Sequence, residues 1–350
     1  MQWRQNTWLK WGAAGLAVVA LIGGGSLWFW LRSTEHRLSK ICGGMLPAGD
    51  TAGMISDAGD LRLEDRHLDR TPVEVPELSR RCKANNIWVT IEPATGTDDS
   101  LGASSFDGGN GHLPVPLGSG WTGFVVRDDH DDAGAVLLDC ANWGADKGEG
   151  LYITVEDSDG ADTGPENRAS LARVLTGTAL RAAEATGCEA EPAERAGKIA
   201  PLPPETPRKL SGATGTCAGT TSQDMAREAP AGTSPVEVCI LGPDVARGPG
   251  KGIVLTAKYG PYAVPVSEYS KGPAGVKSLY MWGSAVCGGP LGTARYTAVP
   301  RNENRVFASE RDPARAEPPT EAELADLARF AEASAERHGC EPPALPPVSR

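Results

Sequence analysis

The longest uninterrupted apolar segment of the chain lies close to its N-terminus. Residues 12–31 form a run of 20 residues without a charged side chain, with Lys10 before it and Arg32 after it. In a helix, about 20 residues cross a hydrocarbon core of about 30 Å. Tryptophans stand at both ends of the run, where indole rings favour the lipid headgroups: Trp8, Trp11, Trp28 and Trp30. The pattern predicts a transmembrane helix over residues 12–31, preceded by a tail of residues 1–11.

A cleaved signal peptide is the alternative interpretation of this segment. Signal peptides have a shorter apolar region and small residues at the cleavage site. Here the run ends in Leu-Trp-Phe-Trp-Leu, and its only stretch of small residues is 23–26. Cys42 follows Lys40-Ile41 instead of small residues that directly adjoin the run, so it does not resemble a lipidation site. We therefore expect an uncleaved anchor.

Two Ala-rich segments further along the chain have the apolar spacing of amphipathic helices. Residues 167–188 and 320–340 both end in Gly-Cys followed by Glu. Thr320 and Glu323 have the spacing of a capping box, and each terminal glycine stands where helices often adopt a left-handed conformation. Both segments are predicted to be helices.

Strand-like apolar runs precede these helices in the same order. One run ends at Cys140 and the next begins at Leu151, while in the second half the corresponding runs end at Cys287 and begin at Ala294. An earlier strand in each half lies beside another cysteine. Four cysteines with the same strands and the same final helix predict an internal duplication.

The predicted fold class is α+β: an N-terminal transmembrane helix followed by two tandem disulfide-bonded α+β units related by internal duplication. Copy one spans residues 41–190 and copy two spans residues 216–342. Residues 191–215 are rich in proline without apolar periodicity, which predicts a semi-rigid linker. Residues 94–123 are rich in Gly, Ser and Asp, which predicts a long exposed loop.

The cysteines indicate the compartment. All eight follow the apolar run, none has Cys-x-x-Cys spacing, and no histidine is spaced with them as in a zinc site. An even number of such cysteines predicts disulfides in an oxidising compartment. This places residues 32–350 outside the cytosol and leaves only the short tail inside. The cysteines are Cys42, Cys82, Cys140, Cys188, Cys217, Cys239, Cys287 and Cys340.

The predicted order of strands also suggests how these cysteines pair. If the strands on either side of Cys140 are antiparallel, the following helix runs parallel to the first of them and brings Cys188 back to Cys140. Four cysteines allow three pairings in each copy, so other pairings stay open. Applied to both copies, this geometry predicts the bridges Cys140–Cys188 and Cys287–Cys340, which leaves the pairs Cys42–Cys82 and Cys217–Cys239.

The net charge of −11 is unevenly distributed. Residues 1–40 carry +4, residues 41–200 carry −15, and residues 201–350 are neutral. Binding to a nucleic-acid backbone requires an excess of Lys and Arg, so we expect no nucleic-acid partner. The acidity belongs to copy one, where a site that depends on charge should be sought first.

The chain carries few motifs of catalytic or cofactor sites. Gly118, Gly120 and Gly123 have the G-x-G-x-x-G spacing, but prolines precede them and a strand-like run follows, which predicts a turn and not a nucleotide site. There is no Gly-x-Ser-x-Gly, no His-Glu-x-x-His and no phosphate-binding loop. The tryptophans beyond the anchor, such as Trp88 and Trp282, are expected to pack in cores or on strands. We therefore predict no catalytic or cofactor-binding residue.

Two acidic clusters remain. Residues 128–132 lie between two strand-like runs and are expected at a solvated hairpin tip. Asp157, Asp159 and Asp162 surround a glycine as oxygen ligands of Ca²⁺ can, although their spacing is not that of an EF-hand loop. These three residues are the candidate metal ligands, and calcium is the one candidate cofactor.

Several short motifs carry a resemblance. Cys42-Gly43-Gly44 precedes Leu46-Pro47, helices end in Gly-Cys at Cys188 and Cys340, and only 10 of the 34 basic residues are lysine. This layout resembles uncharacterised membrane-anchored or secreted extracytoplasmic proteins of Streptomyces-type actinobacteria, over most of residues 41–342. Copy two departs from it at its opening, Cys217-Ala218. The resemblance implies a single-pass cell-membrane protein with a cytosolic N-terminus and extracellular domains, and it implies no activity.

These observations lead to an expected function. We expect a membrane-tethered extracytoplasmic binding or assembly module of the cell envelope without an identifiable catalytic motif. It would contact the lipid bilayer through residues 12–31 and an envelope protein or glycan through its outer units. The alternative is an envelope hydrolase or a calcium-dependent binder that uses the acidic residues of copy one.

Overall fold

A computed structural model describes most of the chain after the apolar run. The described residues are 34–56, 58–68, 79–94, 113–127, 131–144, 148–158, 164–191, 194, 196–243, 252–263, 272–300 and 318–347. The predicted transmembrane segment, residues 12–31, lies outside them. Among the described helices, none is long and apolar enough to cross a membrane.

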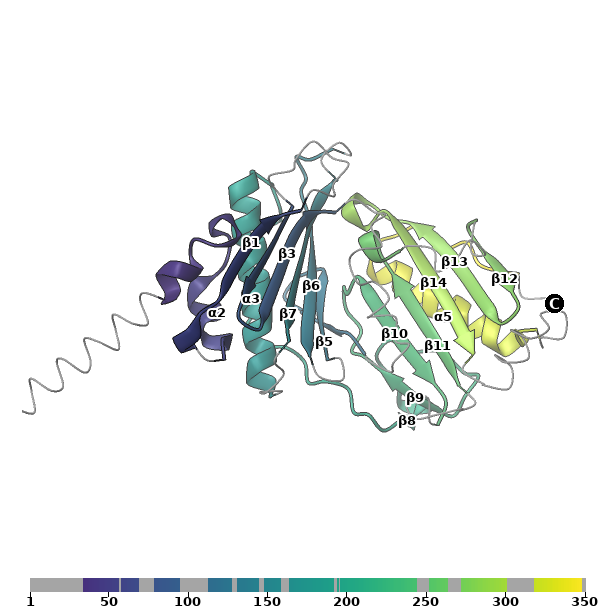
Figure 1. Cartoon of the computed structure of the whole chain (residues 1–350). Helices are drawn as coiled ribbons and strands as arrows, with labels where there is room; N and C mark the ends of the chain where they lie inside the picture. Colours follow the sequence, from purple (N-terminus) through teal and green to yellow (C-terminus); the bar gives the residue numbers. More distant parts are fainter. Residues whose placement is uncertain are drawn as a thin grey trace, which may run out of the picture.

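The first unit is a seven-stranded antiparallel sheet with the strand order β1-β2-β3-β7-β6-β5-β4 (Figure 1). The long helix α3 packs on one face of this sheet, and the short helix α2 packs against α3. The elements are η1 (Cys42–Gly44), α2 (Ala48–Met54), η2 (Ala58–Asp60), β1 (Leu63–His67), β2 (Arg80–Ala84), β3 (Ile87–Pro93), β4 (Val115–Pro116), β5 (Gly123–Arg127), β6 (Asp132–Asp139), β7 (Gly150–Asp157) and α3 (Pro165–Thr186).

The second unit is another seven-stranded antiparallel sheet, in the order β12-β13-β14-β11-β10-β9-β8, and helix α5 packs on one of its faces. Its elements are β8 (Arg208–Lys209), η5 (Leu210–Gly212), β9 (Met225–Glu228), β10 (Val236–Leu241), β11 (Ile253–Lys258), η6 (Gly260–Tyr262), β12 (Gly275–Lys277), β13 (Tyr280–Val286), η8 (Gly289–Leu291), β14 (Thr293–Pro300) and α5 (Glu321–Arg337). The predicted α+β class is thus confirmed for the described residues.

The two sheets share a strand order. In the first sheet the neighbours β2-β3-β7-β6-β5 correspond to β10-β11-β14-β13-β12 in the second. In both, the last strand before the helix pairs with the second strand of a hairpin whose first strand carries a cysteine, Cys82 or Cys239. The common origin of the two units stays a prediction, although they share this framework.

All four predicted disulfides are confirmed: Cys42–Cys82, Cys140–Cys188, Cys217–Cys239 and Cys287–Cys340. Cys140 follows the end of β6, and the helix after β7 returns its C-terminal end to this point. Because β6 and β7 are antiparallel, the helix runs parallel to β6, as the sequence argument assumed. The described residues contain no free cysteine.

Both predicted long helices are confirmed, with small changes at their ends. The first begins at Pro165, which suits the first turn of a helix because proline lacks an N–H there, and it ends at Gly187, with φ +64°. The second has the predicted capping box: Glu323 N–H donates to the Thr320 hydroxyl, and the Glu323 carboxylate accepts from the Thr320 N–H.

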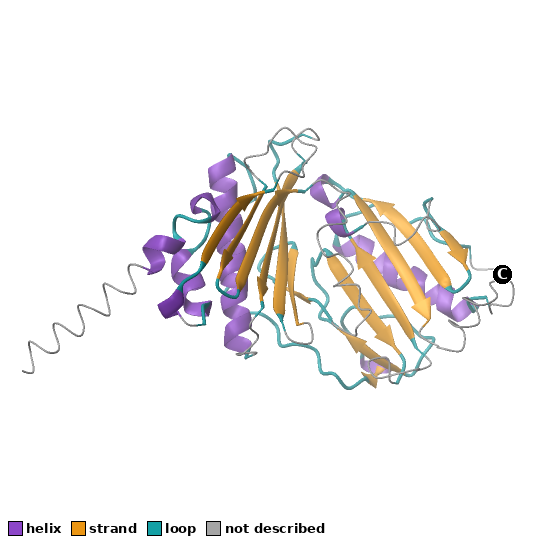
Figure 2. Ribbon diagram, in the orientation of Figure 1, coloured by secondary structure: helices purple, strands orange, loops and turns teal. Residues whose placement is uncertain are grey.

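The faces of the two sheets that lie away from the helices pack against each other. In the first sheet, Phe124, Leu137 and Tyr152 belong to this contact, and in the second sheet Val238 and Ile240. Figures 1 and 2 show the resulting arrangement, with α3 on the side of the first sheet that faces away from the second unit. The layers are therefore helix, sheet, sheet and helix. No residue of β1, β2 or β3 belongs to the described inter-sheet cluster.

The prediction of an exposed loop over residues 94–123 was wrong for residues 113–117. Leu113, Val115 and Leu117 are buried, and β4 pairs with β5. These residues alternate with Pro114 and Pro116, so the segment has the period of an edge strand, where proline is tolerated. Residues 95–112 lie outside the described part.

The predicted linker also contains structure. β8 and η5 lie within residues 191–215, and β8 pairs with β9 at the edge of the second sheet. Ala196 is buried in the core of the first unit, where its N–H donates to the Thr176 hydroxyl of α3. The segment therefore packs along the protein instead of spacing two independent units.

Candidate functional site

Asp157, the one candidate calcium ligand within the described residues, is already satisfied by amide donors. Its carboxylate accepts hydrogen bonds from Asn86 Nδ2 at 2.6 Å and Asn167 Nδ2 at 3.0 Å, and it is 4% exposed. Asp159 and Asp162 lie outside the described residues. Among those that the structure describes, no group of three His, Cys, Asp or Glu side chains is arranged to hold a metal. The calcium site stays a prediction.

The second acidic cluster does connect two strands, as predicted, because β5 and β6 pair on either side of it. Asp132 is not solvated, however, since it is buried and forms an ion pair with Arg127 at 3.0 Å. Burial lowers the pKa of Arg168, and the negative charge of Asp132 offsets part of this decrease. Asp128–His130 lie outside the described residues. Asp132 is thus a structural ion-pair partner.

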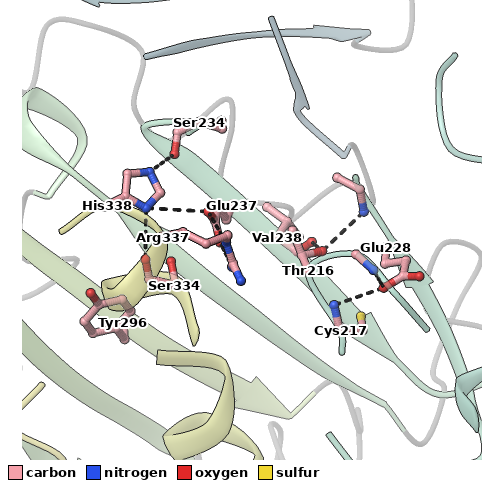
Figure 3. Close-up of polar contacts among 12 residues, drawn as sticks. Thr216, Cys217, Glu228, Ser234, Glu237, Val238, Tyr296, Ser334, Arg337 and His338 are labelled. Atoms are coloured by element: carbon pink, nitrogen blue, oxygen red, sulfur yellow. Dashed lines mark hydrogen bonds and ion pairs between the residues drawn. The ribbon is translucent and has the colours of Figure 1, made fainter. Parts of the chain in front are cut away.

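A buried polar network connects the sheet of the second unit to the end of α5 (Figure 3). Glu237 on β10 is 2% exposed, forms an ion pair with Arg337, and lies 3.7 Å from His338 Nδ1. The two ring nitrogens of His338 lie 3.0 Å from the Ser334 carbonyl and 2.9 Å from the Ser234 carbonyl. This network anchors the C-terminal end of α5 to β10.

The same network contains the residue types of a hydrolytic triad without its geometry. His338 contacts the carbonyl of Ser334 and not its hydroxyl, which is hydrogen-bonded to the Tyr259 hydroxyl. The Tyr259 ring stacks on His338 with centroids 3.9 Å apart. A nucleophile must be hydrogen-bonded to its base and reachable by a substrate. Ser334 is fully buried, so this network is structural.

A different arrangement is found on hairpin β2–β3, on the face turned away from α3. Asn85 and Asn86 form its two-residue turn, and Asn85 has φ +52°, which asparagine tolerates in such turns. The register places Lys83 directly opposite Trp88. On the other face of β2, Cys82 is tied to Cys42. The turn and the disulfide together hold this hairpin in one position.

Two cations lie over the indole ring of this hairpin. Lys83 Nζ is 4.2 Å and Arg81 Cζ is 4.7 Å from the ring centroid of Trp88. Arg81 is exposed, while Lys83 and Trp88 are half-buried. Such contacts contribute about 0.5–1 kcal/mol at exposed sites, and they restrict the rotamers of both cations. We call Arg81, Lys83 and Trp88 the cation–indole face.

The charges of this face are not neutralised by neighbours. Among the described residues, no carboxylate lies within 4.0 Å of the Arg81 or Lys83 side chain. Glu64 is opposite Lys83 on β1, but it pairs with Arg66 at 2.8 Å. Glu156, opposite Trp88 on β7, is exposed. The cation–indole face therefore presents two cations that form no ion pair with a described residue, on a unit that is acidic as a whole.

Sequence reasoning missed this site. It placed Trp88 within a single strand that follows Cys82, whereas the chain reverses at Asn85-Asn86. An Asn-Asn pair between two apolar stretches is a signal for a two-residue turn, and such a turn fixes the register. With that register, Lys83 and Trp88 could have been placed opposite each other. The cation–π contacts themselves depend on side-chain conformations.

No protein-family model matches the chain, and no curated protein or solved structure matches it.

Proposed function

We propose that the chain is a membrane-tethered extracytoplasmic binding module that engages an anionic polymer of the cell envelope. The observation that carries this proposal is the pair of unneutralised cations, Arg81 and Lys83, held on Trp88 at an exposed sheet face. A binding surface whose side chains are ordered beforehand loses less entropy when its partner arrives. The fixed hairpin supports the same interpretation.

The spacing of the cations favours a polymer. Arg81 and Lys83 lie two residues apart on one strand, and thus about 7 Å apart along it. Successive anionic groups of a polymer can contact both cations at once. A polyanion would also gain from the long-range attraction, which decays over about 8 Å at physiological ionic strength. An envelope glycan or phosphate polymer that carries repeated negative charges fits these two cations.

The location of the module is part of the proposal. The apolar run at residues 12–31 is long enough to span a bilayer, and four disulfides suit an oxidising compartment. We propose an uncleaved anchor with residues 1–11 in the cytosol and both units outside, as in the actinobacterial envelope proteins that the sequence resembles.

We also propose that the two units arose by internal duplication. The shared strand order, the equivalent disulfides and the final helix of each unit support this origin. Only the first unit has the Asn-Asn hairpin, because the hairpin of the second unit has a longer connection between β10 and β11. The cation–indole face would then be a feature that the first unit acquired after the duplication.

Binding of defined polymers to the full-length chain in mild detergent tests the proposed function. The probes are polygalacturonate, a glycerol phosphate polymer and neutral dextran, measured by biolayer interferometry. We expect both anionic polymers to bind, dextran not to bind, and added salt to weaken binding. The variant R81Q/K83Q keeps long polar side chains but removes both charges, and it should weaken binding by about tenfold.

The matched control is R62Q/K198Q, which removes one arginine and one lysine from exposed positions elsewhere. It should leave the affinity nearly unchanged. If both double variants weaken binding equally, net charge and not the cation–indole face is responsible. If neither anionic polymer binds, the proposed function is wrong.

The proposed location has its own test. The protein is isolated from cells that express it, its N-terminus is sequenced, and intact cells are treated with protease. We expect the N-terminal sequence to begin before residue 12, allowing for loss of Met1, and both units to be digested from outside. A mature chain that begins after residue 26 would contradict the anchor.

A further inference from the structure

The edge of the second sheet contains a small polar pocket. It lies between the chain segment before β8, the strand β8 itself, the turn after η5 and the strand β9, with a volume of about 140 Å³. Three cationic side chains line it, namely Arg208, Lys209 and Arg227. It belongs to the second unit, so it is a different feature from the cation–indole face.

Arg227 is the unusual member of this pocket. It is only 8% exposed, yet among the described residues no carboxylate lies within 4.0 Å of its guanidinium group. Its Nε donates to the carbonyl of Pro204 at 3.3 Å, and Pro204 also lines the pocket. The guanidinium group therefore lies at the wall of the pocket. The guanidinium group has five N–H donors, and among the described residues it forms no other hydrogen bond.

A buried cation without a counter-ion is costly, because burial removes it from water. Burial lowers the pKa of Arg227, and the charge of Glu205 offsets this only in part. An arginine remains charged in proteins in spite of such a shift. The pocket thus contains a positive charge whose hydrogen-bonding capacity is largely unused.

Glu228, the one carboxylate among the residues that line the pocket, does not pair with Arg227. Glu228 accepts the backbone N–H groups of Thr214 at 3.0 Å, Gly215 at 2.8 Å and Cys217 at 3.2 Å. Figure 3 shows Glu228 directed toward Cys217. Its oxygens are therefore engaged in holding the turn that follows η5. Arg208 and Lys209 are exposed and likewise have no carboxylate within 4.0 Å among the described residues.

We infer that this pocket binds a phosphate-type oxyanion, with Arg227 as the buried contact and Arg208 and Lys209 at the entrance. The planar guanidinium group donates two parallel hydrogen bonds to such oxygens. The volume of about 140 Å³ is large enough for one phosphate group with its ester substituent. The inference is independent of the proposed function, because it concerns other residues and a ligand that need not be a polymer.

Equilibrium dialysis of the full-length chain with radiolabelled inorganic phosphate tests the inference, at constant ionic strength. We expect saturable binding of one phosphate per chain within roughly 20 mM, which would nearly fill a site with a Kd of about 1 mM. R208Q/K209Q should weaken binding several-fold and R227M by at least about tenfold. The control R62Q/K198Q should bind as the unchanged chain does.

Since R227M changes a buried residue, its fold is first checked by circular dichroism. If it does not fold, the surface variant R208Q/K209Q decides the question. Glycerol phosphate and a glycerol phosphate polymer are then added as competitors. Competition by the polymer identifies a phosphodiester as the ligand group, and competition by the monoester alone identifies a small phosphate. Absence of saturable phosphate binding, or binding unaffected by the R208Q/K209Q and R227M variants, would overturn the inference, whether or not polyanions bind the cation–indole face.

Discussion

The hydroxyl groups of Tyr152 and Tyr262 are hydrogen-bonded to each other, although 110 residues separate them in the chain. Tyr152 belongs to β7 of the first unit and Tyr262 to η6 of the second. Their rings meet edge to face with centroids 5.4 Å apart, and both side chains are fully buried. This pair joins the two units through a polar contact beside the apolar side chains of the inter-sheet cluster.

The tyrosine pair allows a direct test of the contact between the units. Removing one hydroxyl, as in Y152F, deletes the hydrogen bond between the two buried hydroxyl groups, which costs about 1–3 kcal/mol. Removing both, as in Y152F/Y262F, leaves no unsatisfied group. We expect the double variant to be more stable than the sum of the single losses predicts. Urea unfolding of all four proteins measures this coupling, and strictly additive losses would contradict it.

The disulfides of the second unit should differ in their contribution to stability. The Cys287–Cys340 bridge closes 53 residues and the Cys217–Cys239 bridge closes 22. Restriction of the unfolded chain predicts contributions of about 4.2 and about 3.4 kcal/mol respectively. The two double Cys→Ala variants are compared by urea unfolding. If the shorter loop proves the more stabilising, chain entropy does not explain these bridges.

The disulfide framework was predictable because it depends on the order of elements along the chain. Antiparallel strands on either side of Cys140 force the next helix to return toward that cysteine, whatever the side chains are. The packing of the two sheets was not predictable in this way. Phe124, Leu137 and Tyr152 could have faced a helix, solvent or another sheet, and alternation along a strand does not distinguish these partners.

The candidate sites also depend on three-dimensional packing that the sequence does not reveal. Acidic residues clustered in the sequence suggested calcium at Asp157, whereas the fold brings Asn86 and Asn167 to that carboxylate. Arg227 carries no sequence signal at all, since its isolation depends on which carboxylates the fold places elsewhere. Local clusters are visible in a sequence, while a charge that lacks a partner is visible only in three dimensions.

The role of Asp157 can be separated from calcium binding. In D157N, an amide N–H₂ replaces one of the carboxylate oxygens that accept from Asn86 and Asn167, so two donors face each other. We expect a loss of about 1–3 kcal/mol that is the same with and without calcium. Thermal unfolding of both proteins, with millimolar CaCl₂ or EDTA, checks this. Stabilisation of the unchanged chain by calcium that is lost in D157N would instead support the predicted calcium site.

Alkaline pH should destabilise the protein through its buried tyrosines. Burial raises the pKa of Tyr280 and Tyr296 to about 12, and it also raises the pKa of Tyr152, Tyr259 and Tyr262. In the unfolded chain these groups ionise near pH 10. Their contribution is therefore complete below about pH 10 and is lost as the pH rises through the folded-state pKa values.

Absorbance at 295 nm measures the ionisation of the tyrosines, and circular dichroism on the same samples shows whether the protein is still folded. At about pH 11 the folded protein should show little tyrosinate, while the protein in urea should be largely ionised. Unfolding midpoints in urea should decrease from about pH 10 upward. A midpoint of ionisation near pH 10 in a protein that is still folded would show that these side chains are accessible to water.

The ion pair between Glu237 and Arg337 should be far more sensitive to substitution than a surface pair. In R337M the Glu237 carboxylate, 2% exposed, loses its main counter-ion, which typically costs about 3–5 kcal/mol. The matched control is R62M, because the Arg62 and Asp60 side chains are 82% and 69% exposed and such pairs contribute about 0–1 kcal/mol. In E237M/R337M no buried charge is left unpaired, so part of the loss should be recovered. Urea unfolding of the four proteins gives the comparison. Equal losses in R337M and R62M would mean that water reaches Glu237 and that the network of Figure 3 does not anchor α5.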